Sequence, residues 1–373
     1  MVERLEEVCS RCVMDTTVAD ISFDHRGCCN YCIAADTRLN EETYSNDPKN
    51  LNKLVKKIKK SGKNKEYDCV IGISGGVDSS YVAYLVKDLG LRPLAVHLDN
   101  GWNTDLSISN INSLLDSLNI DLYTHVIDWE EFKDLQVAFL RSSIANAEIP
   151  TDHAIGALLF NSAIKHNIKY VLHGGNIATE SIMPAKWMES AFDLKLLKKI
   201  HKKYGKKKLS TYPVMGLLRM AYNTFFRRIK YIGILNYVDY DKEAAISLLE
   251  NKFNWKRYEA KHFESIFTRW FQGFFLPTKF NMDKRKAHYS SLIMAKQMTR
   301  LEALDKLNEE PLDQVTASED TDYVMKKLEL TKEEMNEILN DIPKNDLDYS
   351  NTRKYVGFLN EQLKFAKKVA SGR

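Results

Sequence analysis

Short apolar runs and amphipathic segments follow one another from residue 67 to residue 173, a pattern that predicts strands alternating with helices. An amphipathic helix is expected from Tyr81 to Leu89, ended by Gly90. Strands that are joined through helices predict an α/β fold, in which a parallel sheet carries helices on both faces. The expected strands are apolar runs of the kind found in buried parallel sheets: Asp68–Ile73, Pro93–Leu98, Leu122–Ile127 and Lys169–His173.

Helical patterns flank this region on both sides. A basic helix is expected from Leu51 to Lys60, and its lysines are interpreted as a solvated face. Residues 193–208 contain eight lysines and predict a basic surface helix or loop. Residues 214–250 are apolar and aromatic with helical spacing, and the chain after about Met294 is expected to form helices with acidic and basic faces.

Composition restricts the class of protein. The 373 residues are enough for two or three domains, and 44% hydrophobic and 28% charged residues are ordinary for a globular chain. The net charge of +4, from 54 basic and 50 acidic residues, does not by itself indicate nucleic-acid binding. There is no apolar run of about 18 residues and the first residues are charged, so we expect neither a spanning helix nor a signal peptide. A cytoplasmic protein without a membrane partner is therefore predicted.

The loop between the first predicted strand and helix has the features of an anion-binding turn. Its glycines allow backbone N–H groups to face an anion, and the helix N-terminus adds partial positive charge. Its aspartate is interpreted as a helix cap or as a ligand of phosphate-bound Mg²⁺. The loop is neither a Walker A sequence nor Gly-x-Gly-x-x-Gly. The candidate binding residues are Ser74, Gly75, Gly76, Val77, Asp78, Ser79 and Ser80.

This loop matches the SGGxDS signature and resembles the PP-loop enzymes in its strand–loop–helix context as well as in its letters. The resemblance implies an enzyme that cleaves ATP between the α- and β-phosphates, adenylates a carbonyl oxygen and releases pyrophosphate. Ligands bind an open α/β sheet at the carboxyl ends of its strands. By resemblance, the end of the second predicted strand contacts adenosine, and the turn after the fourth lies near the α-phosphate. These candidates are His97, Asp99, Gly174, Gly175 and Asn176.

Five of the six cysteines lie within the first 32 residues, and none follows residue 69. Cys9-x-x-Cys12 and Cys29-x-x-Cys32 are separated by 16 residues, a spacing that predicts a closed, structural zinc site with four cysteine ligands. Cys28 offers a second spacing to Cys32, and we prefer Cys29 because it keeps the two-residue gap. An iron–sulfur cluster and unligated cysteines are the alternatives. This distribution does not fit a secreted disulfide protein.

Several segments together resemble the N-acetyl sugar amidotransferase family, and the resemblance extends to about residue 310. It implies an adenine nucleotide alpha hydrolase-like fold with an N-terminal zinc-knuckle module and a helical C-terminal region. The boundaries expected are 1–36 for the metal module, 37–245 for the ATP-binding domain and 246–373 for the substrate-binding region. Besides the loop, the segments are Cys9–Asp15, Gly27–Cys32, Pro150–His153, Lys261–Glu264, Thr268–Arg269, Lys279–Arg285 and His288–Ile293.

This family resemblance implies a specific reaction with ATP, Mg²⁺ and structural Zn²⁺. ATP adenylates the amide oxygen of an N-acetyl sugar, ammonia attacks the imidate carbon, and AMP leaves an acetamidino group on a bacterial surface sugar. Candidate sugars are pseudaminic or legionaminic acid, or nucleotide-linked diacetamido-uronic acids. The implied catalytic residues are Asp78, Asp152, His153 and Lys186, the last on leaving pyrophosphate. The implied substrate-binding residues are Lys261, Glu264, Arg269, Lys284, Arg285 and His288.

Ammonia must come from elsewhere. A glutaminase needs a nucleophilic cysteine, and the only one outside the metal module, Cys69, lies in a predicted buried strand. A separate glutaminase with a cyclase-like channel subunit is therefore expected as partner, and nucleic acid is not. Two other hypotheses are a tRNA thiolase, which would generally need cysteines downstream of the loop, and a silent nucleotide-binding scaffold, against which the intact loop argues.

Overall fold

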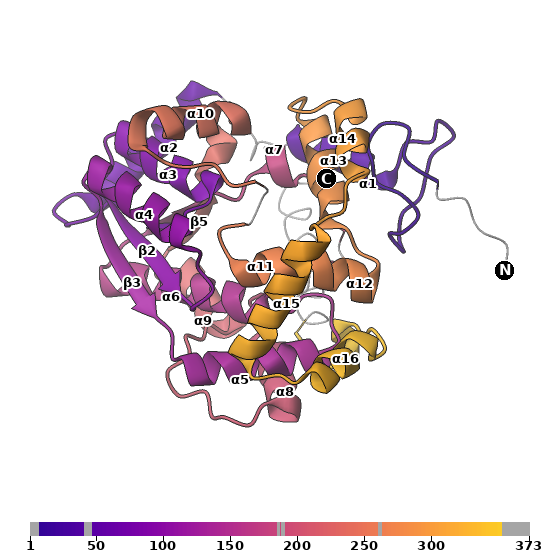
Figure 1. The fold of residues 1–373 in the computed structure, drawn as a ribbon. Helices are drawn as coiled ribbons and strands as arrows, with labels where there is room; N and C mark the ends of the chain where they lie inside the picture. Colours follow the sequence, from indigo (N-terminus) through magenta and orange to yellow (C-terminus); the bar gives the residue numbers. More distant parts are fainter. Residues whose placement is uncertain (1–6, 41–46, 185–186, 188–190, 260–262, 353–373) are drawn as a thin grey trace, which may run out of the picture.

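The centre of the protein is a five-stranded sheet, seen in a computed structural model that describes residues 7–40, 47–184, 187, 191–259 and 263–352 (Figure 1). All neighbouring strands are parallel, in the order β3-β2-β1-β4-β5. The four predicted strands are confirmed. The strands are β1 (Cys69–Gly72), β2 (Pro93–Asp99), β3 (Asp121–Val126), β4 (Tyr170–His173) and β5 (Lys230–Gly233).

The fifth strand corrects the sequence analysis, which expected helix throughout residues 214–250. That segment holds α9 (Leu217–Phe225), β5, a short 3-10 helix (Ile234–Tyr237) and α10 (Lys242–Phe253). β5 has only four residues and pairs with β4, which lies far away in the sequence. Pairing of this kind is set by tertiary contacts, so local periodicity does not reveal it.

Helices cover both faces of the sheet, as predicted. Alternate strand residues point to opposite faces, so Ile71 and Ala95 belong to one buried cluster and Val70 and Val96 to another. On the first face lie α2 (Pro48–Gly62), α3 (Val77–Asp88), α4 (Asp105–Leu118) and α10. On the second lies α6 (Ile149–Lys165); α5 (Trp129–Ser142) packs against α6, and α8 (Leu194–Tyr204) packs against α5.

The cysteine-rich N-terminal part and the C-terminal helices pack into the second of these clusters, which runs from Cys9 to Tyr349. The three predicted domains therefore share one core, and their boundaries remain predictions. The helices expected after about residue 294 are present. The other elements are α1 (Asn30–Leu39), α7 (Ile177–Glu180), α11 (Ile266–Trp270), a π-helical turn (Phe271–Phe275), α12 (Leu276–Phe280), α13 (Lys284–Met294), α14 (Arg300–Leu307), α15 (Gln314–Leu328), α16 (Lys332–Asn340) and a 3-10 turn (Asp346–Asp348).

The predicted basic segment forms α8, which is amphipathic: its lysines are exposed, whereas Leu196, Leu197 and Ile200 are buried. Among the described residues, no helix is both long enough and apolar enough to cross a membrane.

Candidate active site

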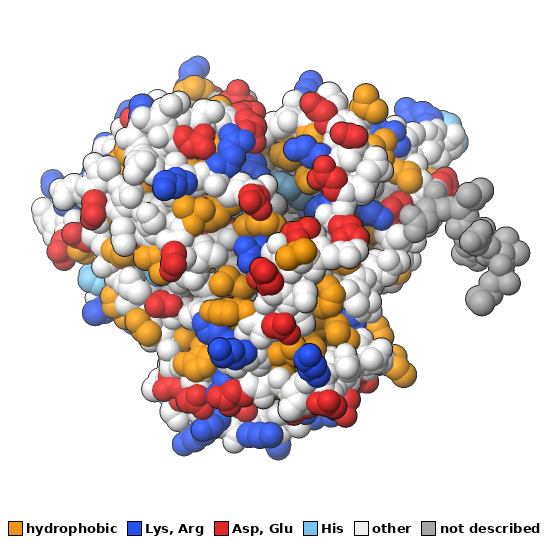
Figure 2. All heavy atoms as spheres, viewed as in Figure 1, with side chains coloured by type: hydrophobic (Ala, Val, Ile, Leu, Met, Phe, Trp, Pro, Cys, Tyr) orange, Lys and Arg blue, Asp and Glu red, His pale blue; other side chains and the backbone are white. Residues whose placement is uncertain are grey.

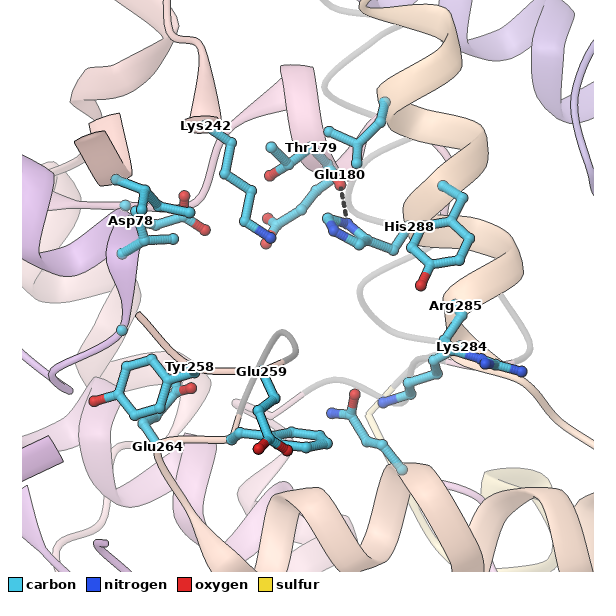
Figure 3. Close-up of a pocket in the computed structure, with 18 of the residues that line it drawn as sticks. Asp78, Thr179, Glu180, Lys242, Tyr258, Glu259, Glu264, Lys284, Arg285 and His288 are labelled. Carbon is cyan, nitrogen blue, oxygen red and sulfur yellow. Dashed lines mark hydrogen bonds between the residues drawn. The ribbon is translucent and has the colours of Figure 1, made fainter. Parts of the chain in front are cut away.

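A cavity of about 720 Å³ lies where the loop after β1 and the turn after β4 face the C-terminal helices (Figure 3). Its size is typical of a small-molecule site. In Figure 2 it opens between the part of the surface that carries α10 and the part that carries α13 and α14, with charged side chains around it. Twelve of the predicted site residues line it: Ser74, Gly76, Val77, Asp78, Ser79, Gly174, Gly175, Glu264, Arg269, Lys284, Arg285 and His288.

The loop after β1 is held in one conformation by its own hydroxyls. Ser79 Oγ accepts from Ser74 N at 3.2 Å and donates to Gly76 O at 3.0 Å. Gly75 has a φ of +85°, and a Cβ there would lie 2.7 Å from the carbonyl oxygen of Ser107. Only glycine fits this position. No side chain caps α3 within the described structure, so its first N–H groups are available to an anion in the cavity.

Asp78 lies in the first turn of α3, and its carboxylate accepts a hydrogen bond from the hydroxyl of Tyr240. It does not cap the helix, because the cap position is Gly76. Of the two roles considered for Asp78, the helix cap is therefore wrong, and the Mg²⁺ ligand remains a prediction. Burial and the Asp78 charge raise the pKa of Tyr240, which therefore remains a donor at neutral pH.

Two aromatic side chains hold the loop from behind. Trp255 Nε1 donates to Gly75 O at 3.1 Å and to Ser80 Oγ at 3.2 Å, and the Tyr258 hydroxyl donates to Gly75 O at 3.2 Å. Ser80 is fully buried, so its predicted contact with ATP is corrected: the hydroxyl accepts from Trp255 instead. Gly75 likewise contributes its conformation rather than a cavity surface.

The opposite wall is the N-terminal half of α13, which presents Lys284, Arg285 and His288 (Figure 3). These cations have partners. Arg285 forms a bidentate pair with Asp283, with a shortest distance of 2.8 Å, and Lys284 Nζ lies 3.9 Å from Glu148.

Arg269 forms a closer ion pair than Lys284 does. Its Nε and Nη2 each lie 2.7 Å from one carboxylate oxygen of the buried Asp320. Arg269 therefore reaches the cavity as half of an ion pair, and Asp320 sets its orientation.

Polar and charged residues that the sequence analysis did not select also line the cavity, among them Thr179, Glu180, Lys242, Tyr258 and Glu259 (Figure 3). The main-chain carbonyl of Thr179 accepts from His288 Nδ1 at 3.3 Å, which joins α7 to α13. Lys242 begins α10 and points into the cavity from the side of Asp78. No motif marks these residues, because they come from loops and helix ends that only tertiary packing brings together.

Three candidates at the sheet ends have structural partners and do not line the cavity, and their predicted contacts with ATP remain predictions. His97 is buried, with Nδ1 2.9 Å from Ile73 O. Asp99 accepts from Gly101 N at 2.9 Å, and Asn176 caps α7 by accepting from Thr179 N at 2.9 Å.

The predicted catalytic role of His153 is wrong, because its side chain is fully buried and both ring nitrogens are bonded to backbone groups. Nε2 accepts from Met215 N at 3.0 Å. The proton is therefore on Nδ1, which donates to Ala191 O at 2.6 Å. Burial lowers the pKa of His153, so the ring is neutral and has a structural role. Asp152 is exposed and does not line the cavity. Lys186 and Lys261 lie outside the described residues.

The cysteines of the N-terminal part form one buried cluster, in which the sulfurs of Cys9, Cys12, Cys29 and Cys32 all lie within 4.8 Å of one another. The Sγ–Sγ distances are 3.9 Å for Cys9 and Cys32 and 3.7 Å for Cys12 and Cys29. A tetrahedral site with metal–sulfur bonds of about 2.3 Å needs sulfurs about 3.8 Å apart. The four residues fit a metal, and the set contains Cys29 rather than Cys28, in agreement with the preference for the two-residue gap.

This cysteine module is attached directly to the cavity wall. Arg300, at the start of α14, donates to the carbonyl oxygens of Cys9 and Cys12, both at 3.0 Å. Ser290 Oγ of α13 accepts from Val13 N at 3.2 Å. The module therefore contacts the second half of α13, after Lys284, Arg285 and His288.

Two families match separate parts of the chain. Residues 49–213 match NAD synthase, and residues 264–364 match the family described as LPS biosynthesis protein WbpG-like, C-terminal domain. A tRNA-specific 2-thiouridylase (MnmA 2) from Fusobacterium nucleatum is 27% identical over 139 residues. That match includes 35% of this chain and spans 38% of the relative's length.

Solved structures are similar at low identity. NMN synthetase from Francisella tularensis is 18% identical, with 76% of this chain and 97% of that chain covered and a TM-score of 0.29. An NH3-dependent NAD synthetase from Campylobacter jejuni, in complex with nitrate, is 16% identical, with 75% and 93% covered and a TM-score of 0.30.

Proposed function

From the premise that this chain is a PP-loop protein with a WbpG-like C-terminal domain, we propose that it is an ATP-dependent amidotransferase acting on an N-acetyl sugar. The observation that carries the proposal is the shared cavity. One wall is the loop at Asp78, from the part of the chain that matches an ATP-using ligase family, and the other is α13, from the WbpG-like part. A cavity built by both can hold ATP and a second substrate together.

The reaction proceeds in two balanced steps. The amide oxygen of the acetamido group attacks the α-phosphorus of ATP, and pyrophosphate leaves. Ammonia then adds to the imidate carbon, and the C–O bond breaks, so the amide oxygen departs on AMP and an acetamidino group remains. An amide oxygen is a poor leaving group until it is adenylated, which explains the need for ATP.

One set of cavity residues suits ATP, and another suits the acceptor sugar. The N–H groups at the start of α3 and the hydroxyl of Ser74 suit phosphate oxygens. The Asp78 carboxylate, oriented by Tyr240, suits a phosphate-bound Mg²⁺, which neutralises charge on the phosphates. Lys242, which points in beside Asp78, is the described lysine best placed for leaving pyrophosphate.

On the acceptor side, Lys284 and Arg285 suit the phosphate or carboxylate of an acidic sugar. The Glu264 carboxylate lies beside the loop: a Cβ on Gly76 would come within 2.8 Å of its Oε1. A carboxylate there repels phosphate oxygens and favours a ligand that donates hydrogen bonds, such as incoming ammonia or a sugar hydroxyl.

We assign the four-cysteine cluster to structural zinc, because four thiolates close the coordination sphere and leave no position for substrate. Ammonia is assigned to a separate glutaminase with a cyclase-like channel subunit. Five of the six cysteines lie in the N-terminal module, and Cys69 is fully buried in β1, so none suits glutamine hydrolysis at the cavity. The same distribution argues against sulfur transfer, the activity named for the thiouridylase relative. The reaction is expected in the cytoplasm.

The test supplies purified protein with ATP, Mg²⁺, ¹⁵N-ammonium and candidate N-acetyl sugars, including acidic and nucleotide-linked ones. The proposal requires AMP, pyrophosphate and a ¹⁵N-containing amidine in equal amounts. Asp78→Ala should abolish pyrophosphate release without changing zinc content, whereas Asp88→Ala, at the exposed far end of the same helix, should behave as wild type. Pyrophosphate release with tRNA and with no sugar would refute the proposal, and turnover with glutamine alone would refute the separate glutaminase.

A further inference from the structure

Basic charge is concentrated in one part of the chain. Residues 194–238 contain nine lysines and three arginines and no aspartate or glutamate. The net charge of +4 for the whole chain conceals this segregation. Acidic groups of α5 contact this segment just after α8: Lys207 Nζ lies 3.6 Å from Glu130, and Asp134 accepts from the backbone N–H groups of Lys206 and Lys207.

The same segment carries large apolar side chains in solvent. The exposed fractions are 89% for Leu218, 78% for Phe226, 69% for Phe225 and 52% for Tyr222. They belong to α9 and the residue that ends it, and the only buried residue of α9 is Asn223. Isolated exposed leucines are common, but four large apolar residues on one short amphipathic helix indicate a surface that contacts another apolar phase.

Lysines border this apolar face at its first residue, Leu218. A groove with a volume of about 800 Å³ separates α8 from α9, and Leu194, Leu217 and Leu218 line it together with lysines of α8. Within the described part of the chain, no salt bridge forms at Lys198, Lys199 or Lys202. We define the α8–α9 surface by these residues: Lys198, Lys199, Lys202, Leu218, Tyr222, Phe225, Phe226 and Arg227.

This surface is separate from the catalytic cavity. In Figure 1, α8 and α9 lie in the lower half of the molecule, whereas α13 and α14 lie in the upper half. Lys and Arg side chains gather along the lower edge of Figure 2, where α8 lies in Figure 1. None of the residues that define the α8–α9 surface lines the cavity.

We propose that the α8–α9 surface binds an anionic lipid bilayer, with the apolar side chains of α9 in the headgroup region and the lysines of α8 against the lipid phosphates. A short helix with leucine and phenylalanine on one side and basic residues around it is the physical pattern of interfacial membrane binding. Each lysine or arginine near an anionic surface adds to the attraction. This proposal does not depend on the amidotransfer reaction, and it changes the expectation that no membrane is a partner.

Charge and composition favour lipid over the other possible occupants. A second copy of this chain would bring the same basic groups together across a twofold axis, and like charges repel. Protein interfaces are enriched in arginine and depleted in lysine, whereas nine of the twelve basic residues here are lysines. Nucleic acid attracts the same lysines, but it offers no partner for a leucine that is 89% exposed.

The protein itself provides a matched control in α2, another basic helix. Lys56, Lys57 and Lys60 of α2 are exposed, but its apolar residues Leu54 and Ile58 are buried, so this helix offers charge without an apolar face. Charge alone therefore predicts equal effects from α2 and α8, whereas the proposed surface predicts an effect from α8 and α9 only.

The experiment measures co-sedimentation of the full chain with phosphatidylcholine vesicles, with and without phosphatidylglycerol, at physiological ionic strength. We expect binding only with phosphatidylglycerol. The triple variant K198Q/K199Q/K202Q and the double variant L218S/F226S should each weaken it by roughly tenfold or more. The control K56Q/K57Q/K60Q should bind as wild type, and all variants should keep the thermal unfolding temperature of wild type.

Three results would overturn the proposal. Equal weakening by the α2 and α8 triple variants would mean unspecific attraction of charge. No vesicle binding, together with binding of tRNA that the α8 variant abolishes, would identify nucleic acid as the occupant. Concentration-dependent dimerisation in sedimentation velocity that L218S/F226S abolishes, without vesicle binding, would identify a second copy.

Discussion

Replacing Gly174 by alanine would force the turn after β4 away from the first turn of α3. A Cβ on Gly174 would lie 2.9 Å from the carbonyl carbon of Asp78 and 3.0 Å from its Cβ. Non-bonded carbon atoms rest about 3.5–4.0 Å apart, so the two segments must separate by about 0.6 Å or more. The obstructing atoms are mainly backbone, which cannot rotate aside.

This displacement acts on the group proposed to bind Mg²⁺. A misplacement of about 1 Å in a catalytic geometry can cost about 100-fold. We therefore expect Gly174→Ala to lower the rate of pyrophosphate release by roughly 10- to 100-fold, which corresponds to about 1.4–2.7 kcal/mol in the barrier. Overpacking of this kind also lowers the free energy of unfolding, by about 1–3 kcal/mol.

The assay is pyrophosphate release at saturating ATP, with thermal unfolding measured in parallel. Gly72→Ala in β1 is the control, because its Cβ would meet only the methyl groups of Leu159, at an ordinary 3.5 Å. Gly72→Ala should keep the wild-type rate of pyrophosphate release and the wild-type unfolding temperature. A wild-type rate in Gly174→Ala, or equal losses in both variants, would show that the close approach of this turn to Asp78 does not position the site.

Three further outcomes test the remaining contacts. Tyr240→Phe removes the hydroxyl that donates to Asp78, so the Mg²⁺ concentration needed for half-maximal pyrophosphate release should rise several-fold, and an unchanged Mg²⁺ dependence would remove Tyr240 from the site. Arg300→Ala deletes the donors to two cysteine carbonyls, and each of these hydrogen bonds contributes at most about 1.5–3 kcal/mol to stability. The variant should unfold at a lower temperature and have a KM that rises more for the sugar than for ATP. Its metal content should not change. Burial lowers the pKa of His173 to about 4, below the value of about 6.5 in an unfolded chain, so the unfolded state binds the proton more tightly. The free energy of unfolding should therefore fall as the pH drops from 6.5 towards 4, and less so in His173→Asn; equal pH slopes in urea unfolding would contradict this.

Much of the ATP-binding half was predictable because its signals are local. The apolar run Cys69–Gly72, the glycines after it and the amphipathic α3 adjoin in sequence, and a strand–loop–helix unit needs only that order. The four-cysteine cluster was predictable for the same reason: two-residue gaps make tight turns that each supply two sulfurs, and the structure brings the four together.

The second wall of the cavity was predictable as a set of residues but not as a geometry. The family resemblance pointed to Lys284, Arg285 and His288, and all three line the cavity. The partner of Arg285, Asp283, is a local neighbour, whereas the partner of Lys284 is Glu148, the residue before α6, which lies far away in the sequence and could not be predicted from local spacing. For His153 the prediction was wrong. The residue lies within a family motif and was expected to be catalytic, but backbone groups bond to both of its ring nitrogens.

By itself, then, the sequence determined the glycine-rich loop, the parallel sheet and the four-cysteine cluster, because each depends on periodicity or on short spacings. The resemblance to amidotransferases came from matching segments along the chain. Only the tertiary structure decided that Tyr240 orients Asp78 across 162 positions and that Arg300 fastens the cysteine module to the helices of the cavity. It also decided that α9 exposes its apolar side chains, although their helical spacing resembles that of a core helix. The physical reason is the same in all three cases: burial and partner choice arise from contacts between distant segments, which no local pattern encodes.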